Sequence, residues 1–221
     1  MTEKSADDLR FFGKVTAGVT HDLQNVIAVI KETAGLMEDI LLMNRDKELP
    51  FFEKFQKSLT TIKNQAIRGS TLIKSLNEFA HAPDNDEKEI DIVATARMLA
   101  ALIERKSRSS EIQIHVEPST APPMIRTHAV RFEMALLMAI ESMMGCVPRG
   151  GSLMIVPEIK EGETIINIRC KEDSGGAGRS SSGPGELPCE SWSALERIVK
   201  TINGHAHRPA QEKGIILRFN V

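Results

Sequence analysis

Residues 12–28 read Phe12-Gly-Lys-Val-Thr-Ala-Gly-Val-Thr-His-Asp-Leu-Gln-Asn-Val-Ile-Ala28 and hold the pattern that decides the fold. Apolar side chains recur here at intervals of three and four residues, which is the spacing along one face of an α-helix. No proline interrupts the pattern on either side, so we predict a single helix from Leu9 to about Met43. Its predicted apolar face consists of Phe12, Val15, Val19, Leu23, Val26, Ile30, Met37 and Leu41.

A turn at residues 44–50 precedes a second long helix, which ends before Pro83. The apolar face predicted for this helix consists of Phe52, Phe55, Leu59, Ile62, Ala66, Ile73, Leu76 and Ala80. Two antiparallel helices touch along one line and cannot enclose a core between them. We therefore expect a homodimer in which two hairpins form a four-helix bundle. The alternative is that the hairpin packs against the second half of its own chain.

The second half of the chain alternates between strands and helices. Strands are predicted at residues 111–117, 152–159, 164–170 and 214–221, and helices at residues 93–106, 129–144 and 191–203. Residues 173–188 are rich in Gly, Ser and Pro and are predicted to form a loop. The predicted fold class is α+β, with a helical hairpin domain at residues 1–83 and an α/β two-layer sandwich at residues 88–221.

The composition excludes several classes of partner. The 221 residues include 28 Lys and Arg against 30 Asp and Glu, a formal charge of -2, and only 4% are aromatic. Balanced charge and scarce aromatic side chains argue against binding to nucleic acid or to an anionic membrane. The three cysteines are widely spaced, and the polar N-terminus has no apolar signal core, so we expect a cytoplasmic protein.

His21 is the candidate reactive residue. It lies about 200° around the helix from Val19 and is therefore expected to face solvent. Asp22 places a carboxylate beside the imidazole, and Asn25 places an amide one turn later. A ring nitrogen with a free lone pair can attack a phosphoryl group, while a carboxylate at the other ring N–H fixes the tautomer. The amide can orient a phosphoryl oxygen or a water molecule.

This stretch resembles the phosphoacceptor box of two-component sensor histidine kinases, a His followed by an acid, two variable residues and an Asn. The resemblance implies a dimerisation and phosphotransfer hairpin followed by an ATP-binding domain of the histidine kinase type. By match, His21 accepts the phosphoryl group, Asp22 acts as the base, and Asn25 helps to hydrolyse a phosphorylated response regulator. The implied partner is a response-regulator receiver domain, which would dock around His21 and on the second helix at residues 67–73.

The second half resembles the family's ATP-binding domain in layout but departs from its chemistry. Met138 and Ser142 stand where the family has two asparagines, and a thioether is a poor ligand for Mg²⁺. Asp173 and Gly175 resemble part of the adenine-binding motif and are the candidate cofactor-binding residues. Cys189-Glu-Ser-Trp192 replaces the family's glycine-rich turn around the phosphates. We expect ATP with Mg²⁺ to bind only above millimolar concentrations.

The sequence thus predicts a protein of two-component signal transduction. It transfers phosphoryl groups through His21 to or from response-regulator aspartates, or it dephosphorylates a regulator. The alternatives are an ATP-dependent histidine kinase and a non-catalytic dimeric scaffold in which His21 has no task, so enzymatic activity stays open. His205-Ala-His207 has the spacing of metal ligands but no third ligand nearby, and we expect no metal site.

Overall fold

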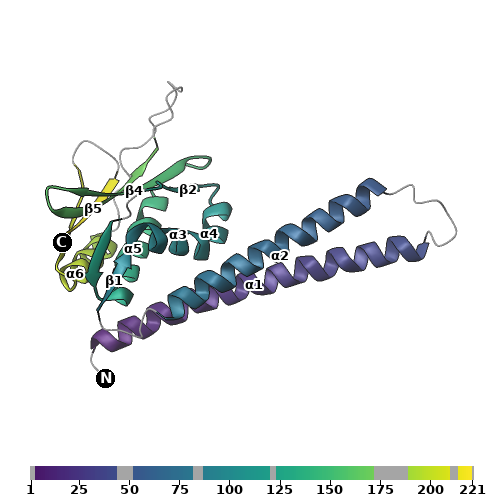
Figure 1. Ribbon diagram of the computed structural model, residues 1–221, viewed down its shortest axis with the longest axis horizontal. Helices are drawn as coiled ribbons and strands as arrows, with labels where there is room; N and C mark the ends of the chain where they lie inside the picture. The colour runs from purple at the N-terminus through teal and green to yellow at the C-terminus, as the bar shows by residue number, and fades with distance from the viewer. Residues whose placement is uncertain are drawn as a thin grey trace.

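A computed structural model describes residues 3–43, 52–81, 87–119, 123–171, 189–209 and 214–220 (Figure 1). Two long antiparallel helices, α1 (Glu3–Met43) and α2 (Phe52–Ala80), form a hairpin, and an α/β domain lies along one side of it. Both predicted helices and the predicted α+β fold class are confirmed. Within the described residues, no helix combines the length and the apolar character needed to cross a membrane.

The α/β domain contains four helices and seven strands in its described part. They follow one another as β1 (Lys88–Asp91), α3 (Ile92–Leu102), α4 (Glu104–Ser109), β2 (Gln113–Val116), β3 (Met124–Thr127), α5 (Ala129–Met144), β4 (Ser152–Lys160), β5 (Glu163–Cys170), α6 (Cys189–Lys200), β6 (Gly204–His207) and β7 (Gly214–Asn220).

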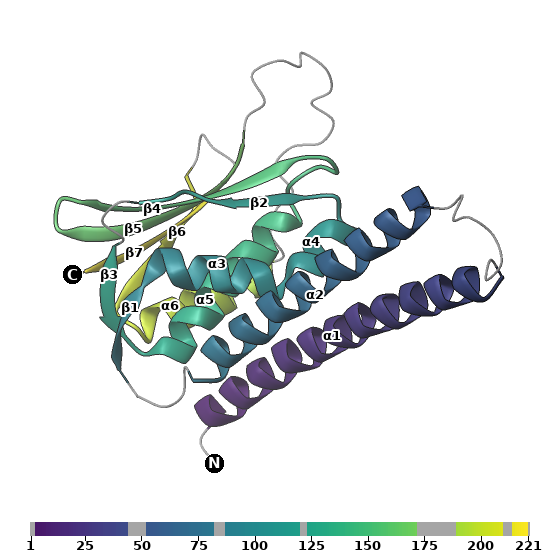
Figure 2. The same ribbon diagram turned by 45° about the vertical axis from the view of Figure 1, so that its right-hand side comes forward.

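A mixed five-stranded sheet forms one layer of this domain. Its strand order is β2-β4-β5-β7-β6, with β2 parallel to β4 and all other neighbours antiparallel, and β1 pairs with β3 in a separate two-stranded sheet. Alternate residues of β4 and β5, such as Ile155 and Ile166, are fully buried, as expected when one face of a sheet is covered. Figure 2 shows α3, α5 and α6 on the side of the sheet that faces the hairpin, and no described helix lies on the opposite face of the sheet.

The hairpin packs against the α/β domain of its own chain. Val19, Leu72 and Phe79 have at most 1% of their surface exposed and share one apolar core with residues of α3 and α5. The rings of Phe12 and Phe79 lie 4.5 Å apart between their centroids. Within a single chain, the arrangement is therefore the alternative raised from the sequence, in which the hairpin covers the second half.

The predicted apolar face of α2 is only partly buried within the single chain. Leu59 and Ile73 are more than half exposed, and the buried residues near the end of the helix are Leu72 and Phe79. The reason is that α2 carries apolar side chains on two faces, and only one of these faces contacts the α/β domain. The other face leaves Leu59, Ile67 and Ile73 exposed.

Candidate functional site

His21 lies near the middle of α1, and its side chain is 55% exposed, which confirms the expectation that it faces solvent. The next residue is rotated by about 100° around the helix axis. This rotation turns the Asp22 side chain toward the α/β domain, where only 5% of it is exposed. One turn of helix thus presents a reactive ring on the outside and a carboxylate on the inside.

The two polar neighbours of His21 approach the same ring nitrogen. The Asn25 amide nitrogen lies 3.1 Å from His21 Nδ1, within hydrogen-bonding distance. Asp22 Oδ1 lies 3.7 Å from the same nitrogen, beyond the length of a normal hydrogen bond. The structure therefore brings all three predicted site residues together, with Asn25 rather than Asp22 bonded to the ring. Nε2 has no hydrogen-bond partner among the described residues.

The orientation of the Asn25 amide decides whether Nε2 can act as a nucleophile. An amide N–H that donates to Nδ1 leaves the ring proton on Nε2, where no lone pair is then available. A rotation of the amide by 180° presents its oxygen, which accepts a hydrogen bond from Nδ1–H and leaves the lone pair on Nε2. The Asn25 amide can therefore select the reactive tautomer of His21.

Asp22 is paired with a residue that the sequence analysis did not identify. Arg105, on α4, places its Nε 2.5 Å from Asp22 Oδ1 in an ion pair that lacks hydrogen-bond geometry. A carboxylate that is this buried requires a nearby positive charge. Arg105 lies in the charged stretch Glu104-Arg-Lys-Ser-Arg108, and no local pattern in that stretch indicates contact with α1.

Two further ion pairs connect the hairpin to the α/β domain. Lys14 on α1 pairs with Glu141 on α5 at 3.0 Å, and Arg68 on α2 pairs with Glu104 on α4 at 3.0 Å. Burial acts to raise the pKa of Glu141, but hydrogen bonds from Lys106 and Lys14 outweigh it and hold the pKa below its ordinary value. Charged contacts from both helices of the hairpin thus hold it against this domain.

The candidate cofactor residues are not part of this arrangement. Asp173 and Gly175 lie outside the described residues. Met138 and Ser142 are half-buried on α5. His205 and His207 are exposed on β6, an edge strand of the sheet. The described residues contain no group of three side chains suited to a metal ion.

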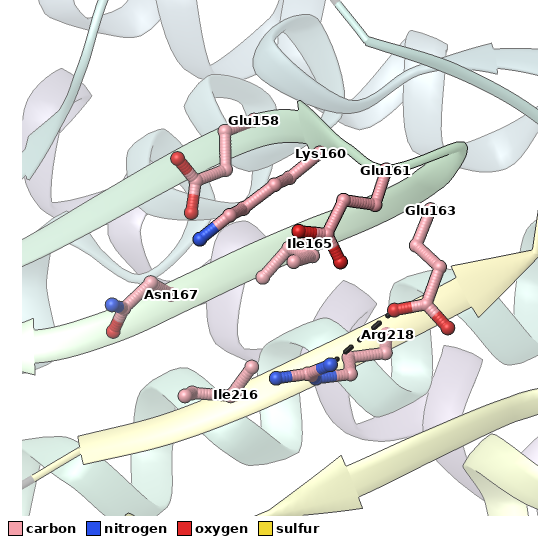
Figure 3. Close-up of a pocket in the computed structure, with 8 residues that line it drawn as sticks. All are labelled: Glu158, Lys160, Glu161, Glu163, Ile165, Asn167, Ile216 and Arg218. Atoms are coloured by element: carbon pink, nitrogen blue, oxygen red, sulfur yellow. Dashed lines mark hydrogen bonds and ion pairs between the residues drawn. The ribbon is translucent and has the colours of Figure 1, made fainter.

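A small pocket lies on the uncovered face of the sheet, away from the hairpin. Figure 3 shows that its lining comes from β4, β5, the turn between them and β7, and is mostly polar. Its charges are mixed, and Arg218 in this lining pairs with Glu163 at 3.3 Å. Helices α3 and α5 lie between the sheet that carries this pocket and α1, the helix that carries His21 (Figure 2). The pocket is therefore a separate feature from the site on α1.

No family model matches the chain. Its structure is similar to the Acinetobacter baumannii histidine kinase AdeS, with 15% identity, a TM-score of 0.48, and coverage of 90% of this chain and 97% of that one. It is similar to a structure described as a bacterial phosphotransferase, with 13% identity, a TM-score of 0.44 and 94% of both chains covered. It is also similar to the histidine kinase ThkA, solved in complex with the response regulator protein TrrA. That match has 16% identity, a TM-score of 0.47, and coverage of 97% of this chain and 62% of that one.

Sensor histidine kinases are thus structural neighbours of this chain over most of its length.

Proposed function

We propose that the protein transfers phosphoryl groups through His21 in a two-component pathway, to or from the aspartate of a response regulator. The observation that carries this proposal is the state of the His21 ring. Nδ1 is held by Asn25 at 3.1 Å, while Nε2 has no partner in the described structure and the side chain is exposed. A ring that is fixed through one nitrogen and open at the other suits a nucleophile.

When the phosphoryl group passes from a regulator to this protein, the lone pair of Nε2 attacks the phosphorus of an aspartyl phosphate on the regulator. An N–P bond forms, the P–O bond to the aspartate breaks, and the aspartate carboxylate leaves with the electron pair. The phosphorylated ring is positively charged while Nδ1 keeps its proton. The Asn25 amide oxygen accepts a hydrogen bond from Nδ1–H, and the charge of Asp22 favours the cationic ring. The reverse reaction returns the phosphoryl group to a regulator.

A second candidate function is removal of the phosphoryl group from a regulator, in which Asn25 positions the attacking water. The observation that favours it is the exposed Asn25 amide one turn from His21, where it can face a docked partner. The two functions use the same surface and differ in whether His21 itself carries the phosphoryl group.

The α/β domain offers little chemistry for ATP in its described part. Met138 and Ser142 supply a thioether and a hydroxyl where a hard cation requires strong oxygen ligands. A phosphoryl group delivered by a partner protein is therefore a better source than ATP. The α/β domain then serves to hold α1 and to bury Asp22.

The surface around His21 fits a protein partner. Ile67 and Ile73 on α2 are more than half exposed, as an apolar contact surface requires. Gly18 lies one turn before His21 on α1, and a Cβ added there would meet no atom within 4 Å. A glycine inside a helix is destabilising relative to alanine. Since packing within the chain does not require it, we attribute Gly18 to close approach by a partner.

We further propose that two copies of the chain associate through their hairpins. Besides Ile67 and Ile73, which we assign to the partner surface, the hairpin exposes further large apolar side chains in the described structure, namely Leu9, Ile27, Leu36, Leu42, Met43 and Leu59. The α/β domain of the same chain does not cover these positions. A second hairpin offers a matching apolar surface and would complete a four-helix bundle.

The test of the main proposal is phosphorylation of the full chain by receiver domains from the same genome, phosphorylated beforehand on their aspartates. The wild-type protein should acquire a label that is lost in acid and kept in base, as a phosphoramidate is. His21→Gln should abolish the label, because a glutamine amide nitrogen has no basic lone pair. His205→Gln, at another exposed histidine, should keep it.

Asn25→Ala should still be labelled if Asn25 mainly positions water, and it should slow the release of phosphate from the regulator. A His21→Gln variant that is labelled as strongly as the wild type would exclude the phosphotransfer proposal. The non-catalytic scaffold would then be the better interpretation.

A further inference from the structure

We propose that Arg105 is a positioning residue of the phosphotransfer site, one that holds the Asp22 carboxylate in place beside the His21 ring. This inference rests on the proposed function of His21. Arg105 comes from α4 of the α/β domain, whereas Asp22 and His21 lie on the hairpin. The site on α1 is therefore completed by a residue from the other part of the chain.

The first argument is the burial of Asp22. Its side chain is 5% exposed, while that of Arg105 is 55% exposed. A buried carboxylate without a counter-charge is unfavourable and either takes up a proton or moves toward water. Arg105 supplies the positive charge from 2.5 Å away. The position of the Asp22 carboxylate thus depends on contact with α4.

The second argument is that both contacts of Asp22 involve the same oxygen atom. Oδ1 lies 2.5 Å from Arg105 Nε and 3.7 Å from His21 Nδ1. Oδ1 accepts no hydrogen bond in the described structure. Arg105 therefore sets the distance between the carboxylate and the ring. A fixed anion next to a ring that gains positive charge stabilises the transition state without rearrangement during the reaction.

The competing explanation is that Arg105 only attaches the α/β domain to the hairpin. The chain offers a matched control, because Lys14 on α1 also pairs with a glutamate of that domain, Glu141 at 3.0 Å. Lys14→Ala removes an ion pair between the same two parts of the chain and leaves Asp22 and Arg105 in place. Attachment and positioning thus predict different results for the two variants.

The experiment measures the rate of labelling of His21 in the full chain by phosphoramidate, a small donor that needs no protein docking. Nε2 attacks the phosphorus, the donor's P–N bond breaks, and ammonia leaves. We expect Arg105→Ala to slow labelling about 10- to 100-fold, since displacement of a catalytic group by about 1 Å has effects of this size. Arg105→Lys should restore most of the rate, and Lys14→Ala should stay within about 2-fold of the wild type.

A double-mutant comparison separates action through Asp22 from any other effect. Asp22→Asn alone and Asp22→Asn combined with Arg105→Ala should be equally slow, because Arg105 acts only through the carboxylate. Thermal unfolding of each variant identifies loss of the fold, and Arg105→Lys gives the result if Arg105→Ala does not fold. Wild-type labelling of Arg105→Ala would overturn the inference, and so would equal slowing by Lys14→Ala.

The same measurements distinguish failure of this inference from failure of the proposed function. If the wild type is phosphorylated on His21 by receiver domains and Arg105 has no effect, only the inference is wrong. If no phosphorylated receiver domain labels the wild type, the proposed function is wrong, whatever the variants do with phosphoramidate.

Discussion

Glu133 makes the stability of the α/β domain depend on pH. The residue lies on α5 with its side chain buried and its Oε2 without a hydrogen-bond partner. Burial raises the pKa of its carboxyl group from 4.5 to about 8, although the charge of Lys88 acts in the opposite direction. The unfolded chain releases the proton of Glu133 near pH 4.5, whereas the folded protein keeps it until the pH approaches 8. The contribution of Glu133 to stability is complete below pH 4.5 and is lost as the pH rises to 8.

Glu133→Gln removes this titration and keeps the shape of the side chain. One pKa unit corresponds to about 1.4 kcal/mol. From pH 5 to pH 7, the free energy of unfolding of the variant should therefore rise relative to the wild type by about 2–3 kcal/mol. The measurement is denaturant unfolding of both proteins at pH 5, 6 and 7. Subtracting the free energy of unfolding of the wild type from that of the variant at each pH cancels the contributions of all other titrating groups.

Glu141→Gln, on the same helix, is the control for this measurement. The pKa of Glu141 is lowered, since hydrogen bonds from Lys106 and Lys14 outweigh the effect of burial. Its contribution is present above pH 4.5 and is lost only as the pH falls through the lowered pKa. The difference between Glu141→Gln and the wild type should therefore be nearly constant from pH 5 to pH 7. If the difference in the free energy of unfolding between Glu133→Gln and the wild type is equally constant from pH 5 to pH 7, the pKa of Glu133 is not raised by burial.

The remaining predictions concern the hairpin. Gly18→Ala should stabilise α1 by about 0.5–1 kcal/mol and yet slow transfer from a phosphorylated receiver domain, whereas Gly35→Ala, which also has space for a Cβ, should leave transfer unchanged. Equal transfer rates for the two variants would contradict close approach at Gly18. Leu59→Asp should make the protein monomeric in sedimentation, and an unchanged dimer would place the interface elsewhere. Leu72→Ala should lower the free energy of unfolding by about 2–5 kcal/mol in denaturant unfolding. A loss below about 0.5 kcal/mol would mean that this face of α2 is not packed.

Local periodicity predicted most elements of the fold. The helix predicted at residues 129–144 has the bounds of α5, Ala129–Met144, because its apolar face repeats without interruption. The helix predicted at residues 93–106 is divided into α3 and α4, because Ile103 leaves helical geometry with φ -103° and ψ 12°. The strand β3 was not predicted, since it is four residues long and directly follows Pro123. Short strands that pair with distant segments leave little trace in the local pattern.

The site could be predicted only as far as it lies within one helix. Exposure of His21 follows from its angle to Val19, and the one-turn spacing to Asn25 follows from the helical repeat. Contact between Asp22 and Arg105 depends on how the hairpin lies against the α/β domain, which no spacing along the chain specifies. The same limit applies to α2, which carries two apolar faces, because the sequence does not indicate which of them the α/β domain of the same chain covers.

The packing of the hairpin gives the site one closed side and one open side. Asp22 faces α4 and is paired there with Arg105, while His21 and Asn25 stand on the outside of α1. Under the proposed function, a partner that carries an aspartyl phosphate would therefore approach from the side opposite the α/β domain. That domain can influence the reaction without touching the phosphoryl group, because it supplies the counter-charge for Asp22. On this view, the α/β domain serves the site through Arg105, a contribution that requires no bound nucleotide.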